Sequence, residues 1–171
     1  MKTRLTLLAG AALALITAFA TAPRDGFETG IYIDAPPQQV WALLTDADEH
    51  AGWNPGMLAV EGRFAPGERL RLSMAMPSGG QITFRPCVLV AEPGQELRWL
   101  GRLGVPRIFD GEHYFILRAE GAGTWLTHGE DFRGLALWFM DVAQFRPAFI
   151  AANEGLKRRA EAVARGVRGD I

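Results

Sequence analysis

GEHYFILRAEGAGTWLTHGEDFRG, residues 111–134, is the stretch that decides the fold, because it has the pattern of a long β-hairpin. In its first arm the odd-numbered positions are the more apolar ones, and His113 and Phe115 share that face. In its second arm the apolar face falls on even-numbered positions, and that face carries His128 and Glu130. The pattern therefore turns polar side chains toward an apolar interior.

The turn between the two arms sets which residues meet. Gly121-Ala122 places glycine at the first central position of a two-residue loop, which is typical of a type II′ turn. The register that follows pairs Ala119 with Thr124, Phe115 with His128, and His113 with Glu130. A three-residue loop with a bulge at Gly123 is the alternative, and it would make His113 and Glu130 diagonal neighbours. Either loop keeps these two side chains within reach of each other.

Composition limits the class of protein. The chain has 171 residues and a formal net charge of -1, which suits one domain with a sizeable core and gives no basic excess for nucleic acid. The single cysteine, Cys87, excludes an internal disulfide, and we expect it to be a small buried hydrophobe.

The N-terminal segment is expected to be separate from this domain. Lys2 and Arg4 precede an apolar run over residues 5–22, the pattern of a signal peptide. We predict that residues 1–22 are a signal peptide cleaved after Ala20, or else a weak N-terminal anchor. The mature protein would then be periplasmic or extracellular, and attached to a membrane if the segment is not cleaved. Residues 23–26 are predicted to be a linker and residues 27–167 the folded domain.

The remaining pattern predicts a mixed α+β domain. A strand over residues 27–33 is followed by a helix that starts near Pro36-Pro37 and by a second short helix over residues 46–53. Six strands follow, which we place at residues 58–64, 69–74, 81–90, 96–101, 108–120 and 124–132. From residue 135 onward the apolar period becomes helical, and Pro147 should begin or kink the long C-terminal helix.

This order of elements, together with local sequence, resembles the SRPBCC superfamily of START and birch-pollen-allergen relatives, particularly its polyketide cyclase/dehydrase branch. The segments that carry the resemblance are Ile33-Asp34-Ala35-Pro36-Pro37, Val40-Trp41, Trp53-Asn54-Pro55, Leu97-Arg98-Trp99, residues 111–115, residues 127–134 and residues 153–157. The resemblance implies a helix-grip fold, in which a curved seven-stranded antiparallel sheet surrounds the C-terminal helix and encloses an elongated apolar cavity. It says less about function, because this superfamily includes carriers, cyclases and hydrolases.

The candidate ligand-binding residues are His113, His128 and Glu130, with Phe115, Trp53 and Trp99 as apolar walls. The three polar groups have three interpretations: a hydrogen-bonded cluster that satisfies itself, a set that orients a ligand, or an acid–base pair. A metal site is not expected, because three adjacent strand positions seldom converge on one ion, and no cofactor is expected.

Two other features receive simpler interpretations. His50 follows Asp48 and Glu49, and we expect it to be solvated. Arg102 and Arg107 bracket a loop that would meet either a ligand carboxylate or solvent.

The leading hypothesis is a binding protein of the cell envelope that encloses a small lipophilic or amphipathic molecule. The alternatives are a cyclase- or hydratase-like enzyme that uses the His/Glu cluster, and an interaction module with a vestigial cavity. No nucleophile motif or dinucleotide fingerprint is present in the sequence.

Overall fold

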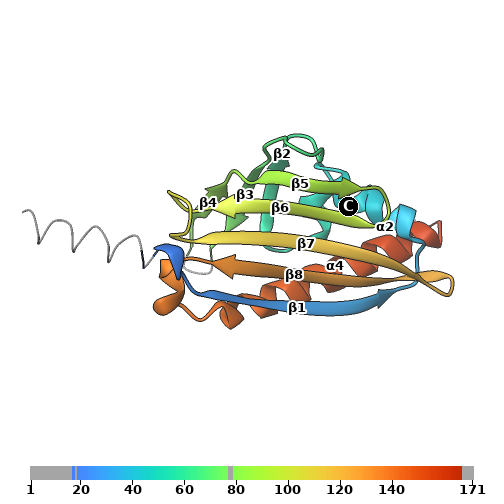
Figure 1. Cartoon of the computed structure of the whole chain (residues 1–171). Helices are drawn as coiled ribbons and strands as arrows, with labels where there is room; N and C mark the ends of the chain where they lie inside the picture. Colours follow the sequence, from blue (N-terminus) through green and yellow to red (C-terminus); the bar gives the residue numbers. More distant parts are fainter. Residues whose placement is uncertain (1–16, 18, 77–78, 167–171) are drawn as a thin grey trace, which may run out of the picture.

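The computed structural model describes residue 17 and residues 19–76 and 79–166, and it has a curved sheet packed around one long helix (Figure 1). The elements in chain order are β1 (Arg24–Ile33), α2 (Pro37–Thr45), α3 (His50–Trp53), β2 (Met57–Glu61), β3 (Arg71–Ala75), β4 (Gln81–Phe84), β5 (Cys87–Glu92), β6 (Glu96–Arg102), β7 (Asp110–Glu120), β8 (Gly123–Arg133), η1 (Leu135–Trp138), η2 (Val142–Phe145) and α4 (Arg146–Ala164). This is the predicted α+β helix-grip architecture.

The strands form two antiparallel sheets. The larger has the order β1-β8-β7-β6-β5, and the smaller has the order β2-β3-β4. The β1 strand pairs with β8 over its whole length, so the first strand of the domain closes against the last one. The hairpin of β7 and β8 therefore lies in the middle of the larger sheet.

The predicted hairpin register is confirmed. Phe115 lies opposite His128, His113 lies opposite Glu130, and the ladder continues to Glu120 and Gly123. The loop is therefore Gly121-Ala122 alone, and Gly121 adopts a positive φ of 58°, as the first central residue of a type II′ turn requires. The bulged alternative is excluded.

The strand count differs from the expected seven because the strand predicted over residues 81–90 is two strands. The β4 strand ends at Phe84 and β5 begins at Cys87, and Pro86 lies in the gap. Proline has no N–H to donate to a strand ladder, so it interrupts a central strand. The two sheets remain joined there by a bridge between Arg69 and Cys87.

The long helix α4 packs its apolar stripe against the inner face of the larger sheet. Phe149, Ala152, Leu156 and Ala160 are buried, with the spacing of one helix face. Pro147 lies in the first helical turn, where its missing N–H costs no helical hydrogen bond. The predicted helical period from residue 135 onward takes the form of two short 3₁₀ helices before α4 begins.

The predicted boundary at the N-terminus also changes. The β1 strand begins at Arg24, because its ladder with β8 starts with the pair of Arg24 and Arg133, so most of the predicted linker 23–26 is strand. Most of the predicted signal or anchor segment 1–22 lies outside the described residues. Among the residues that the structure describes, no helix is long and apolar enough to cross a membrane.

One glycine determines how closely α4 approaches α3. A Cβ atom added at Gly155 would lie 1.8 Å from the carbonyl oxygen of Trp53, a distance that no real side chain tolerates. The Arg159 guanidinium then holds the same two helices together through two hydrogen bonds of 2.8 Å to the Glu49 carboxylate. These contacts fix α3, with His50 and Trp53, over the interior.

We expect Gly155→Ala to lower the free energy of unfolding by about 3 kcal/mol, because the helix must move away from α3. The matched control is Gly52→Ala in α3, where an added Cβ meets nothing within 4 Å. The control should be neutral or stabilising by less than about 1 kcal/mol. Urea denaturation of both variants measures the difference, and equal stabilities would contradict the close packing of α3 and α4.

Candidate functional site

A chain of polar side chains crosses the interior from α4 to the β7–β8 hairpin, and hydrogen bonds join all of its members except the last pair, His113 and Glu130. We call it the polar relay. Its contacts in order are Asn153 Nδ2 to Thr29 Oγ1 at 2.8 Å, Asn153 Oδ1 to His128 Nδ1 at 2.6 Å, His128 Nε2 to His113 Nε2 at 2.8 Å, and His113 Nδ1 to Glu130 Oε2 at 3.5 Å. The relay thus includes all three polar residues predicted from the hairpin.

The donor and the acceptor of each hydrogen bond in the relay follow from Thr29, where the role of the hydroxyl group is fixed. The Thr29 hydroxyl donates to the His128 carbonyl oxygen at 2.9 Å, so it must accept from the amide nitrogen of Asn153. The Asn153 oxygen therefore faces His128 Nδ1, which must carry a proton. His128 Nε2 then accepts from the Nε2–H of His113, which leaves the Nδ1 of His113 without a proton.

This arrangement leaves room for one mobile proton between His113 and Glu130. When the Glu130 carboxyl is protonated, it presents a donor to His113 Nδ1. When His113 takes that proton, the two groups form an ion pair at the same 3.5 Å. The contact therefore allows a proton to pass between the two groups.

Aromatic rings surround the histidines. The His128 ring lies between Phe115 and Phe149, with ring centroids 4.1 and 4.3 Å away. Trp99 stacks on His113 at 4.6 Å, with only 7° between the ring planes. This packing fixes the orientation of both imidazoles.

Burial disfavours the charged form of each ionisable group in the relay, and the pKa of each group shifts accordingly. It lowers the pKa of His113 from 6.5 to about 3 and holds that of His128 well below its ordinary value, where the nearby His113 contributes further. Burial raises the pKa of Glu130 from 4.5 to about 7. Below a pH of about 7 the proton therefore resides on Glu130 and not on His113.

The exposed fraction of the side chains increases along the relay from His128 to Glu130. His128 is only 2% exposed, and both its ring nitrogens are bonded within the protein. The side chains of His113 and Glu130 keep 16% and 21% of their surface accessible. A molecule that meets the relay would therefore meet it at Glu130.

His50 and Trp53 place a second polar pair in the same interior, and the prediction that His50 is solvated is wrong. His50 is 2% exposed, because its imidazole packs against the rings of Trp53 and Phe64. Its Nε2 contacts the Leu44 carbonyl oxygen at 2.7 Å, so this nitrogen donates and Nδ1 is left as an acceptor. Burial lowers the pKa of His50 to about 4, which keeps the ring neutral.

Neither His50 Nδ1 nor the indole Nε1 of Trp53 has a hydrogen-bond partner among the residues that the structure describes. Trp53 is 3% exposed, and its ring centroid lies 4.7 Å from that of His50. A buried donor and a buried acceptor without partners are costly, so a polar group bonded to them would stabilise this part of the interior.

The structure brings the six predicted site residues into one continuous aromatic interior. His50 stacks on Phe64, Phe64 contacts Trp99, and Trp99 stacks on His113. The residues that were not predicted as site residues are Thr29, His50, Phe64, Phe149 and Asn153. Asn153 carried a signal in the sequence, since it lies four residues after Phe149 and therefore interrupts the apolar stripe of the helix.

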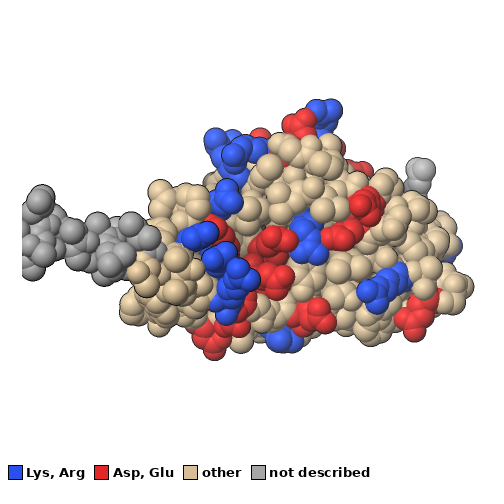
Figure 2. Space-filling view, in the orientation of Figure 1, with Lys and Arg blue, Asp and Glu red and all other residues tan. Residues whose placement is uncertain are grey.

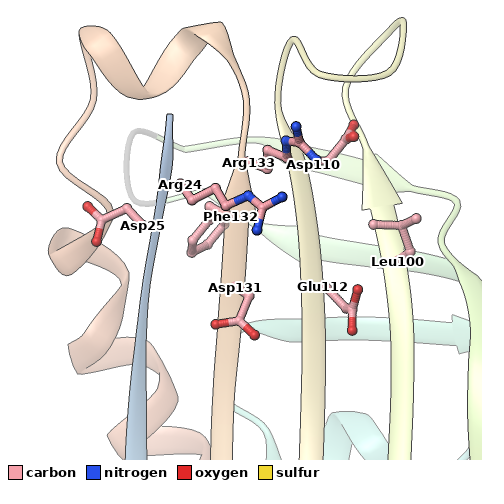
Figure 3. Close-up of a pocket in the computed structure, with 8 residues that line it drawn as sticks. All are labelled: Arg24, Asp25, Leu100, Asp110, Glu112, Asp131, Phe132 and Arg133. Carbon is pink, nitrogen blue, oxygen red and sulfur yellow. The ribbon is translucent and has the colours of Figure 1, made fainter. Parts of the chain in front are cut away.

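A hollow of about 630 Å³ lies on the opposite, outer face of the larger sheet. Acidic and basic side chains stand side by side on this face (Figure 2), and those that line the hollow come from neighbouring strands (Figure 3). The lining residues are Arg24, Asp25, Leu100, Asp110, Glu112, Asp131, Phe132 and Arg133. Glu112 and Asp131 alternate with the inward-facing His113 and Glu130, so the hollow is separate from the polar relay.

Residues 25–161 match the protein family described as "Polyketide cyclase / dehydrase and lipid transport". The chain belongs to this family. The match covers nearly the whole described domain and confirms the resemblance to the SRPBCC superfamily. A search of curated protein sequences found no match.

Solved structures share the family fold. A protein from Rhodobacter sphaeroides is similar with 20% identity and a TM-score of 0.68, over 81% of this chain and 93% of that one. The di-domain ARO/CYC StfQ of the steffimycin biosynthetic pathway has 14% identity and a TM-score of 0.68, over 83% of this chain and 52% of that one. Ara h 8.0201 has 14% identity and a TM-score of 0.62, over 84% of this chain and 99% of that one. At these identities the likeness shows the fold alone.

The raised pKa of Glu130 predicts how the stability of the folded protein changes with pH. The folded protein keeps the Glu130 proton up to a pH of about 7, whereas the unfolded chain releases it near 4.5. Between these values the folded state binds more protons, so Glu130 destabilises the fold as the pH rises. We expect Glu130→Gln, which mimics the protonated carboxyl, to be more stable than the wild type at pH 8 by up to about 3 kcal/mol.

That advantage should disappear below pH 4.5, where Glu130 is protonated in both states. Urea denaturation across the pH range measures it, with Glu120→Gln at the exposed end of β7 as the matched control. A constant difference between Glu130→Gln and the wild type at all pH values would contradict the assignment.

Proposed function

We propose that the protein binds a small lipophilic molecule that carries a hydroxyl or carboxyl group, in the aromatic interior between the sheet and α4. The observation that carries the proposal is the pair of unpartnered buried atoms, His50 Nδ1 and Trp53 Nε1. Family membership supports it, because the family description includes lipid transport.

The hydrogen-bonding roles of these two atoms define which kind of polar group could bond to both. His50 Nδ1 accepts a hydrogen bond and Trp53 Nε1 donates one. A hydroxyl group both donates and accepts, and so does a protonated carboxyl group. The rest of the ligand would contact aromatic walls, which include Phe64 and Trp99.

The polar relay supplies a second contact in this proposal. Glu130 and His113 would meet a polar group of the ligand, since their side chains are partly accessible. His128 has both nitrogens bonded within the protein, so its role is to orient His113. Phe115 would form part of the wall behind both histidines.

We place this binding activity in the cell envelope as part of the same proposal. It rests on the sequence of the first segment, where two basic residues precede an apolar run over residues 5–22. Export would put the protein where lipophilic molecules pass between membranes.

Native mass spectrometry of the full chain, purified without detergent from its own host, tests the proposal. We expect a discrete added mass on the wild type. Trp53→Phe keeps an aromatic ring, although a smaller one, and removes the indole N–H, and the loss of one hydrogen bond should weaken binding about 3- to 10-fold. The matched control is Trp125→Phe, because Trp125 is 40% exposed and lies outside the interior.

The two variants separate the proposed contact from a general effect of losing an indole. Loss of the added mass in Trp53→Phe alone supports the proposed hydroxyl site. A bare polypeptide mass in every sample, or equal occupancy in Trp53→Phe and the wild type, would refute it.

A second candidate function is acid–base catalysis on the bound molecule, as in a cyclase or hydratase. The specific observation in its favour is that Glu130 is partly accessible and has a pKa raised to about 7, so that both its protonated and its ionised forms are populated at neutral pH. Such a group is poised to protonate a ligand oxygen and to recover the proton afterwards.

If the bound compound is converted, we expect turnover to decrease as the pH rises above about 7, because Glu130 then loses its proton. Glu130→Gln should bind the compound but lose turnover at least 100-fold. A chromatographic assay of the compound over time measures both. Unchanged turnover in Glu130→Gln would rule out this candidate and leave the binding proposal intact.

A further inference from the structure

One end of the molecule exposes large apolar side chains on two neighbouring segments. These side chains, which we call the apolar end, are Leu103, Val105, Trp138, Phe139 and Met140. Phe139 is 91% exposed, and Leu103, Val105 and Trp138 are each more than half exposed. Single exposed apolar residues are ordinary, but a group at one end marks an interaction surface.

The two segments are held together by backbone hydrogen bonds. Leu135 N–H donates to the Arg107 carbonyl oxygen at 3.0 Å, and Ala136 N–H donates to that of Ile108 at 3.0 Å. The β6–β7 loop and η1 therefore present one combined surface, at the end of the sheet where β6 and β8 finish (Figure 1). Asp110 holds the loop by accepting from the backbone N–H of Arg107 at 3.1 Å.

Arginine side chains form a cluster beside the apolar end. The strand register places Arg24, Arg133, Asp110 and Arg102 in a row across β1, β8, β7 and β6. Arg107 follows in the adjoining loop, and Lys and Arg side chains are visible together at this end of the sheet in Figure 2. We call Arg24, Arg102, Arg107 and Arg133 the arginine cluster.

Three of the four arginines in the cluster form no ion pair with a described residue, although acidic side chains line the same hollow as Arg24 and Arg133. Arg102 contacts Asp110, at 3.6 Å. Arg24, Arg107 and Arg133 form no ion pair with any of the described residues. Desolvation, together with repulsion from Arg24 and Arg107, lowers the pKa of Arg133 below its ordinary value.

The apolar N-terminal run reaches the same end. The Arg107 guanidinium donates to the carbonyl oxygen of Phe19 at 3.1 Å. Phe19 belongs to the uncharged run over residues 5–22. Phe19, near the end of this uncharged run, therefore lies beside Arg107 and next to the apolar end.

We propose that the apolar end and the arginine cluster together form a docking surface for a membrane that contains anionic lipids. Trp138 and Phe139 would enter the boundary between headgroups and acyl chains, where aromatic rings are favoured. The arginine cluster would contact lipid phosphates, which attract basic residues near the surface.

The charges favour a membrane over a second copy of the chain. A symmetric dimer through this end would bring two arginine clusters toward each other, and like charges at an interface are unfavourable. An anionic lipid surface supplies the opposite charge and an apolar layer side by side. The proposal does not depend on the interior ligand site, because docking needs no bound ligand.

A fluorescent label at residue 139 of the full chain tests the proposal. Cys87 is the single cysteine, so Cys87→Ser with Phe139→Cys gives one site for an environment-sensitive dye. We expect a blue shift in its emission with phosphatidylcholine vesicles that contain phosphatidylglycerol. The same dye at Leu58→Cys, an exposed position on β2, should stay in water.

Charge variants test the arginine cluster. Arg24→Gln/Arg107→Gln should lower partitioning onto the anionic vesicles roughly tenfold or more, and added salt should do the same to the wild type. The matched control removes two exposed arginines elsewhere, Arg118→Gln/Arg158→Gln, and should keep most of the binding.

Three results would overturn the proposal. The first is no sedimentation with anionic vesicles. The second is sedimentation while the dye at residue 139 stays in water, which would assign binding to the N-terminal run alone. The third is a blue shift without vesicles that grows with protein concentration, which would show that a second copy covers the apolar end. Each result leaves the ligand-binding test by mass spectrometry unaffected.

Discussion

The register of the β7–β8 hairpin is the constraint on which the interior depends. Side chains on a strand alternate between faces, so a slip of one residue would turn His113 and Phe115 outward and bring Glu112 and Tyr114 inside. The two-residue loop at Gly121-Ala122 prevents that slip locally. The pairing of β8 with β1 then fixes Thr29 beside His128, which completes the polar relay with Asn153 of α4.

Local sequence was sufficient to predict the parts of the molecule that local geometry controls. The hairpin register followed from one turn, and the contact between His113 and Glu130 followed from the register. The break at Pro86 was not predicted, although a proline inside the expected strand over residues 81–90 was a local signal for it. The SRPBCC resemblance supplied the order of elements around them, and the family match confirmed it.

Long-range packing accounts for what the sequence did not reveal. His50 follows two acidic residues, so its neighbours in the chain suggest solvent. Its burial comes from Phe64, which is distant in sequence, and from α4, which approaches α3 closely at Gly155. The unpartnered state of Trp53 Nε1 likewise depends on which atoms surround it, and a single sequence does not contain that information.

The amide of Asn153 ends the polar relay at α4 and does not pass a proton onward. An amide does not take up or release a proton near neutral pH, and Thr29 prevents it from flipping, because the hydroxyl already donates to a carbonyl oxygen. A proton on the histidines of the relay therefore cannot be released through Asn153. A proton therefore enters or leaves the relay through His113 and Glu130, its partly exposed members, so whatever occupies the space beside them sets the charge of this network.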